Sequence, residues 1–158
     1  MKTKKEITEF YDEYIKYQIE TAFNERQCAL FEKLKSFGLN AKSDVLEIGC
    51  GIGTVTALIS SVTKKGKITA IDISSKSIEV AKERVVNQSN IIFLAEDIMD
   101  YNFGSYKFDL ITLFDVIEHI PMKDHPKLFR KISRLMKDTG LILINIPHPH
   151  SVFFRPAI

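Results

Sequence analysis

The chain is organised around one segment, Val45-Leu46-Glu47-Ile48-Gly49-Cys50-Gly51-Ile52-Gly53. Its first part, Val45–Gly49, is a short apolar run that ends in glycine, which predicts a buried strand and then a turn. Glycine tolerates positive φ and lets a ligand approach the backbone closely, and a helix predicted at Thr54–Val62 presents free N–H groups at its start. The segment therefore predicts a ligand-binding loop, although a plain strand-to-helix turn has the same pattern.

Downstream of this segment, short apolar runs alternate with segments of helical periodicity. The further strands are predicted at Lys67–Asp72, Ile91–Ala95, Phe108–Phe114 and Leu141–Ile146. The further helices are predicted at Ser75–Asn87, with Ile78, Ala81, Val85 and Val86 on one face, and from Pro121 or Lys123 to Lys137, where Asp138-Thr139-Gly140 stops the helix. Apolar strands alternating with helices indicate a doubly wound α/β domain whose parallel sheet is covered on both faces.

The first 43 residues have a different pattern. Residues 5–37 carry apolar side chains at helical spacing, Gly38 is a stop signal, and Asn24 is a candidate N-cap of a second helix. We expect a helical cap over residues 1–43 and an α/β core over residues 44–158, in one structural domain, since 158 residues fit a single domain.

Acidic residues follow the predicted strands. Asp72 ends the second strand, 19 residues after Gly53, where doubly wound folds place an acid that holds ribose hydroxyls. Asp97 follows the third strand and Phe114-Asp115 closes the fourth. Because ligands of such sheets lie beyond the carboxyl ends of the strands, these groups are predicted to surround one nucleoside.

The loop does not have the spacing of a dinucleotide fingerprint, which needs a third glycine at position 54, where this chain has Thr54. In addition, Glu47 lies two residues before the first glycine, and a carboxylate there repels a pyrophosphate. S-adenosylmethionine (SAM) carries an ammonium and a sulfonium and has no phosphate. The electrostatics therefore favour SAM over NAD.

These segments resemble the class I SAM-dependent methyltransferases. Val45–Gly53 is similar to that family's first motif, Ala70-Ile71-Asp72-Ile73-Ser74 to its second, and Glu96-Asp97-Ile98 to its adenine-contacting segment; the likeness covers residues 44–147. The resemblance implies that Glu47, Gly49, Cys50, Gly51 and Gly53 face the methionine part, that Asp72 binds the ribose hydroxyls and that Asp97 binds the adenine amino group. It also implies that Ile73 and Ile98 sandwich the adenine and that Phe114 supplies a backbone contact near the methyl group.

The resemblance implies a methyltransferase that moves the SAM methyl to oxygen or nitrogen of a small-molecule acceptor and leaves S-adenosyl-L-homocysteine (SAH). Family members usually continue past the fifth strand with a helix and two more strands, whereas this sequence ends at Ile158. The expected fold is thus a doubly wound, mostly parallel, Rossmann-like methyltransferase fold that lacks the last two strands. A non-catalytic or partner-completed SAM-binding subunit is the alternative, and a second copy or a partner is expected to cover the edge of Leu141–Ile146.

Three interpretations of Asp115-Val116-Ile117-Glu118-His119 stay open. On a helical turn, Asp115, Glu118 and His119 would share one face. They would then shape the wall of the site, supply His119 as a catalytic general base, or hold a divalent metal for O-methylation. The motif is similar to the metal-binding Glu and His of ubiquinone-pathway O-methyltransferases and small-RNA end methyltransferases.

Other candidate groups have simpler interpretations. Tyr11, Tyr14 and Tyr17 are expected to pack between helices or to form an aromatic lid, His148 and His150 to lie in a rigid loop or to face the acceptor, and His125 to lie at the surface. A basic stripe of Lys127, Arg130, Lys131, Arg134 and Lys137 has an apolar stripe opposite it, which is typical of a surface helix rather than of nucleic-acid binding.

Composition agrees with an ordinary globular protein. The formal net charge of +2 is too small to indicate a nucleic-acid or membrane partner. The two cysteines, Cys28 and Cys50, have no metal-type spacing. With no apolar run of about 18 residues and no apolar signal-peptide core after the charged N-terminus, a cytoplasmic protein is expected.

Overall fold

A computed structural model describes residue 6 and residues 25–86 and 88–147. The first helix and the elements that form the glycine loop are α2 (Glu25–Ser36), β1 (Val45–Ile48) and α3 (Thr54–Val62). They are followed by β2 (Ile68–Asp72), α4 (Ser75–Arg84), β3 (Ile91–Ala95) and β4 (Phe108–Phe114). Two short 3₁₀ turns, η1 (Ile117–His119) and η2 (Met122–Asp124), lead to α5 (His125–Leu135) and β5 (Met136–Asn145).

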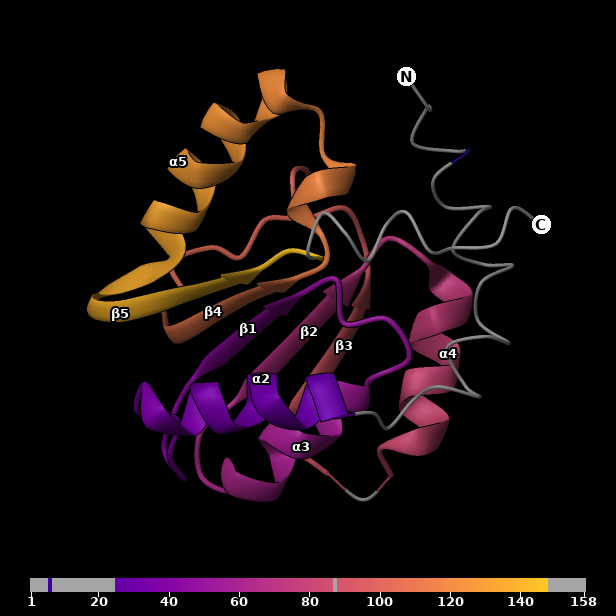
Figure 1. Cartoon of the computed structure of the whole chain (residues 1–158), viewed down its shortest axis with the longest axis vertical. Coiled ribbons are helices and arrows are strands. Elements are labelled where there is room, and N and C mark those ends of the chain that lie inside the picture. Colours follow the sequence, from indigo (N-terminus) through magenta and orange to yellow (C-terminus); the bar gives the residue numbers. More distant parts are fainter. Residues whose placement is uncertain (1–5, 7–24, 87, 148–158) are drawn as a thin grey trace.

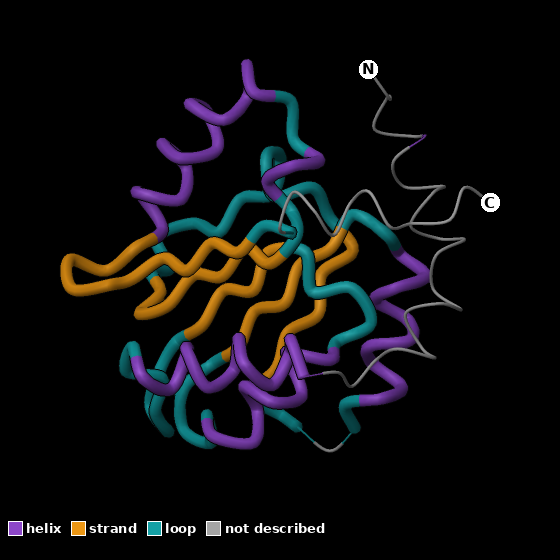
Figure 2. The backbone as a smooth tube through the Cα atoms, in the orientation of Figure 1, coloured by secondary structure: helices purple, strands orange, loops and turns teal. Residues whose placement is uncertain are grey.

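The five strands form one parallel sheet in the order β3-β2-β1-β4-β5, and they lie side by side in Figure 2. Val45, at the start of β1, is level with Ile68 of β2 and with Leu110 of β4. The carboxyl ends of β1, β2 and β4 consequently reach the same edge of the sheet, and the chain order reverses there between β1 and β4. The predicted doubly wound parallel fold is confirmed.

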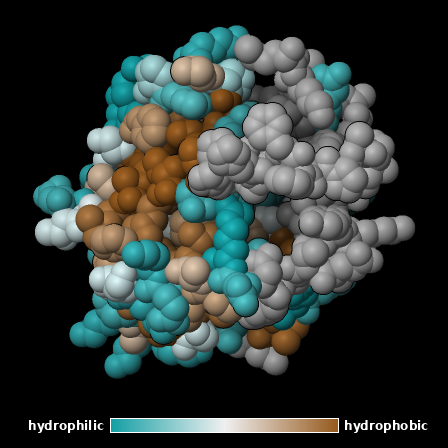
Figure 3. Space-filling model, in the orientation of Figure 1, coloured by the Kyte–Doolittle hydropathy of each residue, from teal (hydrophilic) through white to brown (hydrophobic). Residues whose placement is uncertain are grey.

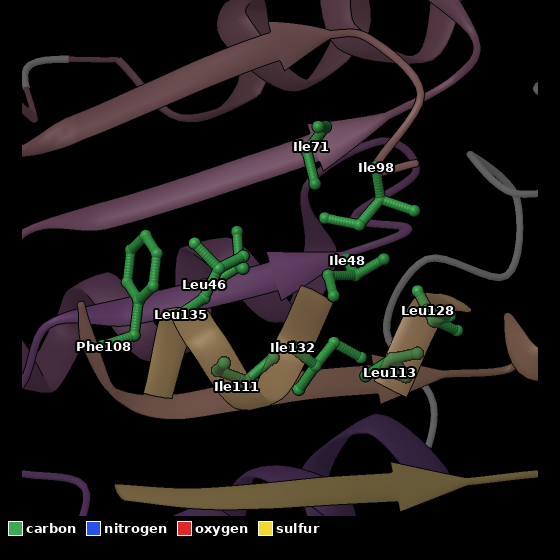
Figure 4. Close-up of a cluster of buried hydrophobic side chains, with 10 residues drawn as sticks. All are labelled: Leu46, Ile48, Ile71, Ile98, Phe108, Ile111, Leu113, Leu128, Ile132 and Leu135. Atoms are coloured by element: carbon green, nitrogen blue, oxygen red, sulfur yellow. The ribbon is translucent and has the colours of Figure 1, made fainter. Parts of the chain in front are cut away.

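Helices cover both faces of the sheet (Figure 1). On one face, Leu34 of α2 and Ile59 of α3 pack with Val45, Ile68 and Leu110 of the strands. On the other face, α5 contributes Leu128, Ile132 and Leu135, which pack against alternate residues of β1 and β4. Figure 4 shows this second cluster, in which the labelled side chains are Leu46, Ile48, Ile71, Ile98, Phe108, Ile111, Leu113, Leu128, Ile132 and Leu135. The central strands β1, β2 and β4 are thus buried from both sides, as their apolar sequences predicted, whereas the outer strands β3 and β5 are only partly covered.

The boundary between α5 and β5 differs from the prediction. The helix ends at Leu135, and Asp138-Thr139-Gly140 belongs to β5 rather than stopping the helix. Met136 pairs with Phe108, and the Lys137 ammonium lies 3.0 Å from Asp44 Oδ2 and 2.9 Å from Asp109 Oδ2. The next pair is Leu141 with Leu110, so the register shifts, and residues 137–140 lie opposite the single residue Asp109. Lys137 is therefore not part of the basic face of α5.

The α4 helix is also shorter than expected. It ends at Arg84, with Val85 as its C-cap residue, while Val86 is 60% exposed and does not lie on the buried face. Ile78 and Ala81 are buried, as predicted. Valine is a poor helix former because its branched side chain loses χ1 freedom, which is consistent with a helix that ends at the pair Val85-Val86.

Only part of the expected N-terminal helical region falls in the described residues. α2 confirms a helix over Glu25–Ser36, and Gly38, with φ of 101°, follows its end as the stop signal predicted. Asn24 and the three N-terminal tyrosines lie outside the described residues. Since Leu34 and Leu39 share a core cluster with Val45, α2 packs directly on the α/β core; a domain boundary at residue 43 stays a prediction.

β5 forms one edge of the sheet and is poorly covered. Leu141 and Ile144 of this strand are 43% and 42% exposed, and Phe129 of α5 is 39% exposed. Figure 3 shows apolar surface, in brown, over the region of α5 and β5. No helix in the described part of the chain is long and apolar enough to span a membrane.

Candidate functional site

The glycine loop between β1 and α3 forms the centre of the site. Gly49, Gly51 and Gly53 have φ values of 74°, 52° and 77°, which confirms the prediction that the loop uses positive φ. The N–H groups of Gly49 and Cys50 both donate to the Ile71 carbonyl, at 2.8 and 3.2 Å, and so tie the loop to β2. Cys50 itself is 6% exposed, and burial raises the pKa of its thiol well above the ordinary value.

Two of these glycines also leave no room for a side chain. A Cβ on Gly49 would lie 2.2 Å from a methyl carbon of Val116, and a Cβ on Gly53 would lie 3.0 Å from that of Ala81. The loop is therefore packed against the segment after β4 and against α4. Its shape depends on these neighbours as well as on its own sequence.

Glu47 is buried beneath the loop, with 4% of its surface exposed. The Thr56 hydroxyl of α3 donates to its Oε2 at 2.6 Å. Burial, with a further contribution from the Asp72 charge, raises the pKa of Glu47 to about 8, although the Thr56 hydrogen bond acts in the opposite direction. At neutral pH the carboxyl is thus mostly protonated, and a cation placed beside it would favour its ionised form.

A neighbouring threonine adds unused hydrogen-bonding capacity. Thr112 of β4 is level with Glu47 in the sheet register. Its hydroxyl oxygen is buried and has no hydrogen-bond partner among the described residues. Buried polar groups are normally hydrogen-bonded, so this oxygen is an unsatisfied polar atom in the strand next to Glu47.

Asp72 joins β2 to the loop. Its Oδ2 accepts a hydrogen bond from the Gly51 N–H at 2.8 Å, and its Oδ1 accepts one from the Ser74 N–H at 2.9 Å. These two bonds hold the carboxylate against the glycine loop at the carboxyl end of β2. The structure places Asp72 beside the glycine loop, as the sequence predicted, and the partly buried Ile73 follows it.

Asp97 and Ile98 occupy the turn after β3. Asp97 Oδ1 accepts from the Met99 N–H at 2.7 Å, so part of this carboxylate closes its own turn. Ile98 is 7% exposed and packs in the core cluster with Ile48 and Ile71 (Figure 4). Their contacts with an adenine ring stay predictions, and so does the backbone contact of Phe114, whose side chain packs on the α2–α3 side of the sheet.

Asp115 follows β4 in a left-handed conformation, with φ of 58°. Both of its carboxylate oxygens accept hydrogen bonds from the guanidinium of Arg26, on α2. The side-chain amide of Asn145, the last residue of β5, lies 3.4 Å from Asp115 Oδ1. No local sequence pattern indicates Arg26 or Asn145 as partners of Asp115, because they lie 89 and 30 positions away.

The predicted common face of Asp115, Glu118 and His119 is wrong. Only Ile117–His119 form a helical turn, and Asp115 lies before it with its carboxylate directed to Arg26. The His119 side chain is 45% exposed, with Nε2 3.9 Å from Glu118 Oε1. Within the described ranges no three His, Cys, Asp or Glu side chains are grouped closely enough to hold a metal ion.

Of the other three histidines, only His125 lies within the described residues, and its predicted surface position is wrong. His125 is partly buried rather than on the surface, and its Nε2 lies 2.8 Å from the Ile120 carbonyl oxygen and 3.2 Å from that of Ile117. It therefore ties η1 to the start of α5. His148 and His150 fall outside the described residues.

The basic stripe of α5 does line a groove. Lys127, Arg130, Lys131 and Arg134 face the loop 100–104 across a cavity of about 410 Å³. The Lys131 ammonium donates to the Tyr101 carbonyl at 2.5 Å and lies over the Phe103 ring. The groove is therefore partly closed by the protein's own contacts.

Comparison with known proteins gives the family context. Residues 45–140 match the family model described as a methyltransferase domain. A curated relative, the phosphoethanolamine N-methyltransferase of Plasmodium falciparum (isolate 3D7), is 40% identical over 112 residues. That match covers 70% of this chain and 41% of the relative, so the chain spans about two fifths of the relative's length.

Two solved structures give the same fold. DhpI in complex with SAH has a TM-score of 0.73 at 19% identity, over 92% of this chain and 69% of that one, which is a likeness of fold alone. Coclaurine N-methyltransferase bound to N-methylheliamine and SAH has a TM-score of 0.66 at 25% identity, over 76% of this chain and 35% of that one.

Proposed function

The chain belongs to the methyltransferase-domain family, and from this premise we propose that it transfers a methyl group from SAM to a nitrogen or oxygen of a small-molecule acceptor. SAM is the cofactor that the family implies, and SAH is its product. The observation that carries the proposal is the placement of Glu47 and Asp72 around the GxGxG loop at the carboxyl ends of β1 and β2.

The residues present fit SAM better than a dinucleotide. Glu47 is a buried carboxyl that would ionise beside a cation, and the unsatisfied Thr112 hydroxyl lies level with it in the sheet. An ammonium suits this polar cluster, whereas a pyrophosphate would add negative charge beside two carboxyl groups. In this proposal Glu47 and the loop hold the methionine part, Asp72 accepts hydrogen bonds from the ribose hydroxyls, and Asp97 accepts one from the adenine amino group.

The cofactor supplies the hard chemistry, because its methyl is bonded to a sulfonium that is a good leaving group. The chain's own contribution is to align the acceptor, and such positioning contributes up to about 7–11 kcal/mol to lowering a barrier. In this proposal the ends of β4 and β5 present the acceptor, with His119 beside it. His119 is exposed enough to meet an incoming molecule.

Both acceptor atoms occur among the matched proteins, since phosphoethanolamine N-methyltransferase and coclaurine N-methyltransferase are named for nitrogen and the StiE O-MT for oxygen. An alkyl amine is protonated at neutral pH and must lose its proton before its lone pair can attack the methyl group. A neutral imidazole is the side chain that most often accepts a proton as a general base in enzymes. We therefore propose His119 as the general base for an amine or hydroxyl acceptor.

A partner-completed SAM-binding subunit is the second candidate. The exposed apolar side chains of the β5 edge favour it, since long uncovered edge strands promote pairing with another chain. In that case the chain alone would bind SAM without turnover. The side-chain arrangement does not favour metal-assisted O-methylation, because the Asp115 carboxylate, a candidate metal ligand, is paired with Arg26.

A radiolabel assay with methyl-labelled SAM tests the proposal against a panel of amines, including phosphoethanolamine, and a matched panel of hydroxyl compounds. Label should move to one acceptor class, His119→Ala should lower kcat with little change in the affinity for SAM, and EDTA should change nothing. An Asp72→Ala variant that retains full SAM affinity would contradict the assignment. SAM binding without transfer, restored by a second protein, would favour the subunit alternative.

A further inference from the structure

Arg26 and Asp115 form a two-bond contact between elements that are far apart in the sequence. Both terminal nitrogens of the guanidinium donate to the two carboxylate oxygens. The hydrogen bonds to Asp115 raise the pKa of Arg26, and the negative charges of Asp115 and Glu118 act in the same direction. Two parallel N–H···O bonds fix orientation as well as distance, so this contact sets how the start of α2 lies against the end of β4.

Among the described residues, burial holds the end of α2 more firmly than its start. Leu34, in the last turn, is the one buried residue of this helix. In the first turn, Gln27 is partly buried, and Glu25, Arg26 and Cys28 are exposed. The last turn of α2 is therefore held by the core, while the contact with Asp115 fastens the first turn to the site.

On the other side of the contact, Asp115 leads directly to the glycine loop. Its left-handed backbone is held by its own N–H, which donates to the Asn145 carbonyl at 2.9 Å. The next residue, Val116, lies against Gly49, where it occupies the space that a side chain at position 49 would need. Arg26, Asp115, Val116 and Gly49 thus form a continuous connection from α2 to the loop.

We propose that Arg26 is a positioning residue of the cofactor site: by holding Asp115 it fixes Val116 against Gly49 and so couples the first turn of α2 to the shape of the glycine loop. The part of this inference that concerns SAM rests on the proposed function. The mechanical part, which concerns how α2 and the loop move together, does not depend on SAM.

The alternative is an ordinary surface ion pair with no consequence beyond itself, since such pairs contribute little. The chain offers a matched control for this alternative. Lys35 and Glu32, 2.7 Å apart, form an exposed ion pair within the same helix. It joins neighbours at i and i+3 and has no connection to the loop.

Hydrogen–deuterium exchange of the full chain tests the coupling. The variants are Arg26→Gln, Asp115→Asn, the double variant, Arg26→Lys and the control Lys35→Gln. Arg26→Gln and Asp115→Asn should each speed exchange about two- to fivefold, both at amides 29–32, which close the first turn of α2, and at amides 49–53 of the loop. Because the two residues act as a unit, the double variant should exchange no faster than either single variant. Arg26→Lys, which keeps the charge, should restore part of the protection.

SAM titration and steady-state kinetics of the same variants give the second readout. The Kd and KM for SAM should rise in Arg26→Gln and Asp115→Asn, with a smaller change in kcat. Lys35→Gln should change neither exchange in the loop nor the Kd. Faster exchange at α2 alone, or additive effects in the double variant, would overturn the proposal. If the unmodified chain binds no SAM, the proposed function fails, and exchange still decides the coupling; if Arg26→Gln does not fold, Arg26→Lys decides it.

Discussion

Replacing Glu47 with glutamine should remove a specific pH dependence of folding stability. The amide keeps the size of the side chain and cannot ionise. In the folded chain the pKa of Glu47 is raised from 4.5 to about 8, chiefly by burial. Between these two values the folded state keeps a proton that the unfolded state has lost, so the free energy of unfolding falls as the pH rises.

The slope follows from linkage. One retained proton corresponds to a loss of about 1.4 kcal/mol per pH unit, so the whole interval from pH 4.5 to pH 8 is equivalent to roughly 5 kcal/mol at most. Below pH 4.5 the carboxyl is protonated in both states and the contribution is fully present. Above pH 8 it is fully lost.

Urea unfolding of the unmodified chain and of Glu47→Gln, at half-unit steps from pH 5 to pH 9, measures this contribution as the difference between two curves. The variant should gain stability relative to the unmodified chain as the pH rises, and the difference should level off above pH 8. If the difference in the free energy of unfolding between the two proteins does not change with pH, Glu47 has the same pKa in the folded and unfolded states, and burial does not raise it.

Three further substitutions test a glycine of the loop, a leucine of the core and a lysine that forms two ion pairs. Gly49→Ala should cost about 1–3 kcal/mol in chemical unfolding, more than the matched Gly104→Ala, because position 49 combines positive φ with contact to Val116 whereas position 104 is open. Leu128→Ala, in the fully buried contact between α5 and the sheet, should lower the free energy of unfolding by about 2–5 kcal/mol, without loss of the far-ultraviolet dichroism of the folded chain. Lys137→Met should cost only about 0.5–1 kcal/mol, and high salt should shrink the difference in midpoint, because both of its ion pairs are partly exposed.

Much of this fold could be predicted from local patterns. The apolar runs of β3 and β4 give the observed bounds, and the glycines of the loop have the positive φ expected of them. Asp72 reaches the loop because parallel strands bring their carboxyl ends to one edge. These features depend on short-range periodicity and on a topology that follows from it.

The features that were missed depend on distant partners. α5 ends at Leu135, three residues before the helix stop predicted at Asp138-Thr139-Gly140, because Met136 already pairs with Phe108 of β4. Asp115 turns to Arg26 instead of to His119, which no spacing indicates. The raised pKa of Glu47 likewise depends on complete burial, which becomes visible only once α3 covers β1.

Isothermal titration calorimetry of the unmodified chain with SAM, in two buffers of different ionisation enthalpy at pH 7, tests the central claim most directly. SAM should bind saturably and NAD should not bind. About one proton at most should be released as the SAM ammonium converts Glu47 to its charged form, and Glu47→Gln should abolish this release. Binding of NAD in preference to SAM, or no binding of SAM at all, would contradict the account.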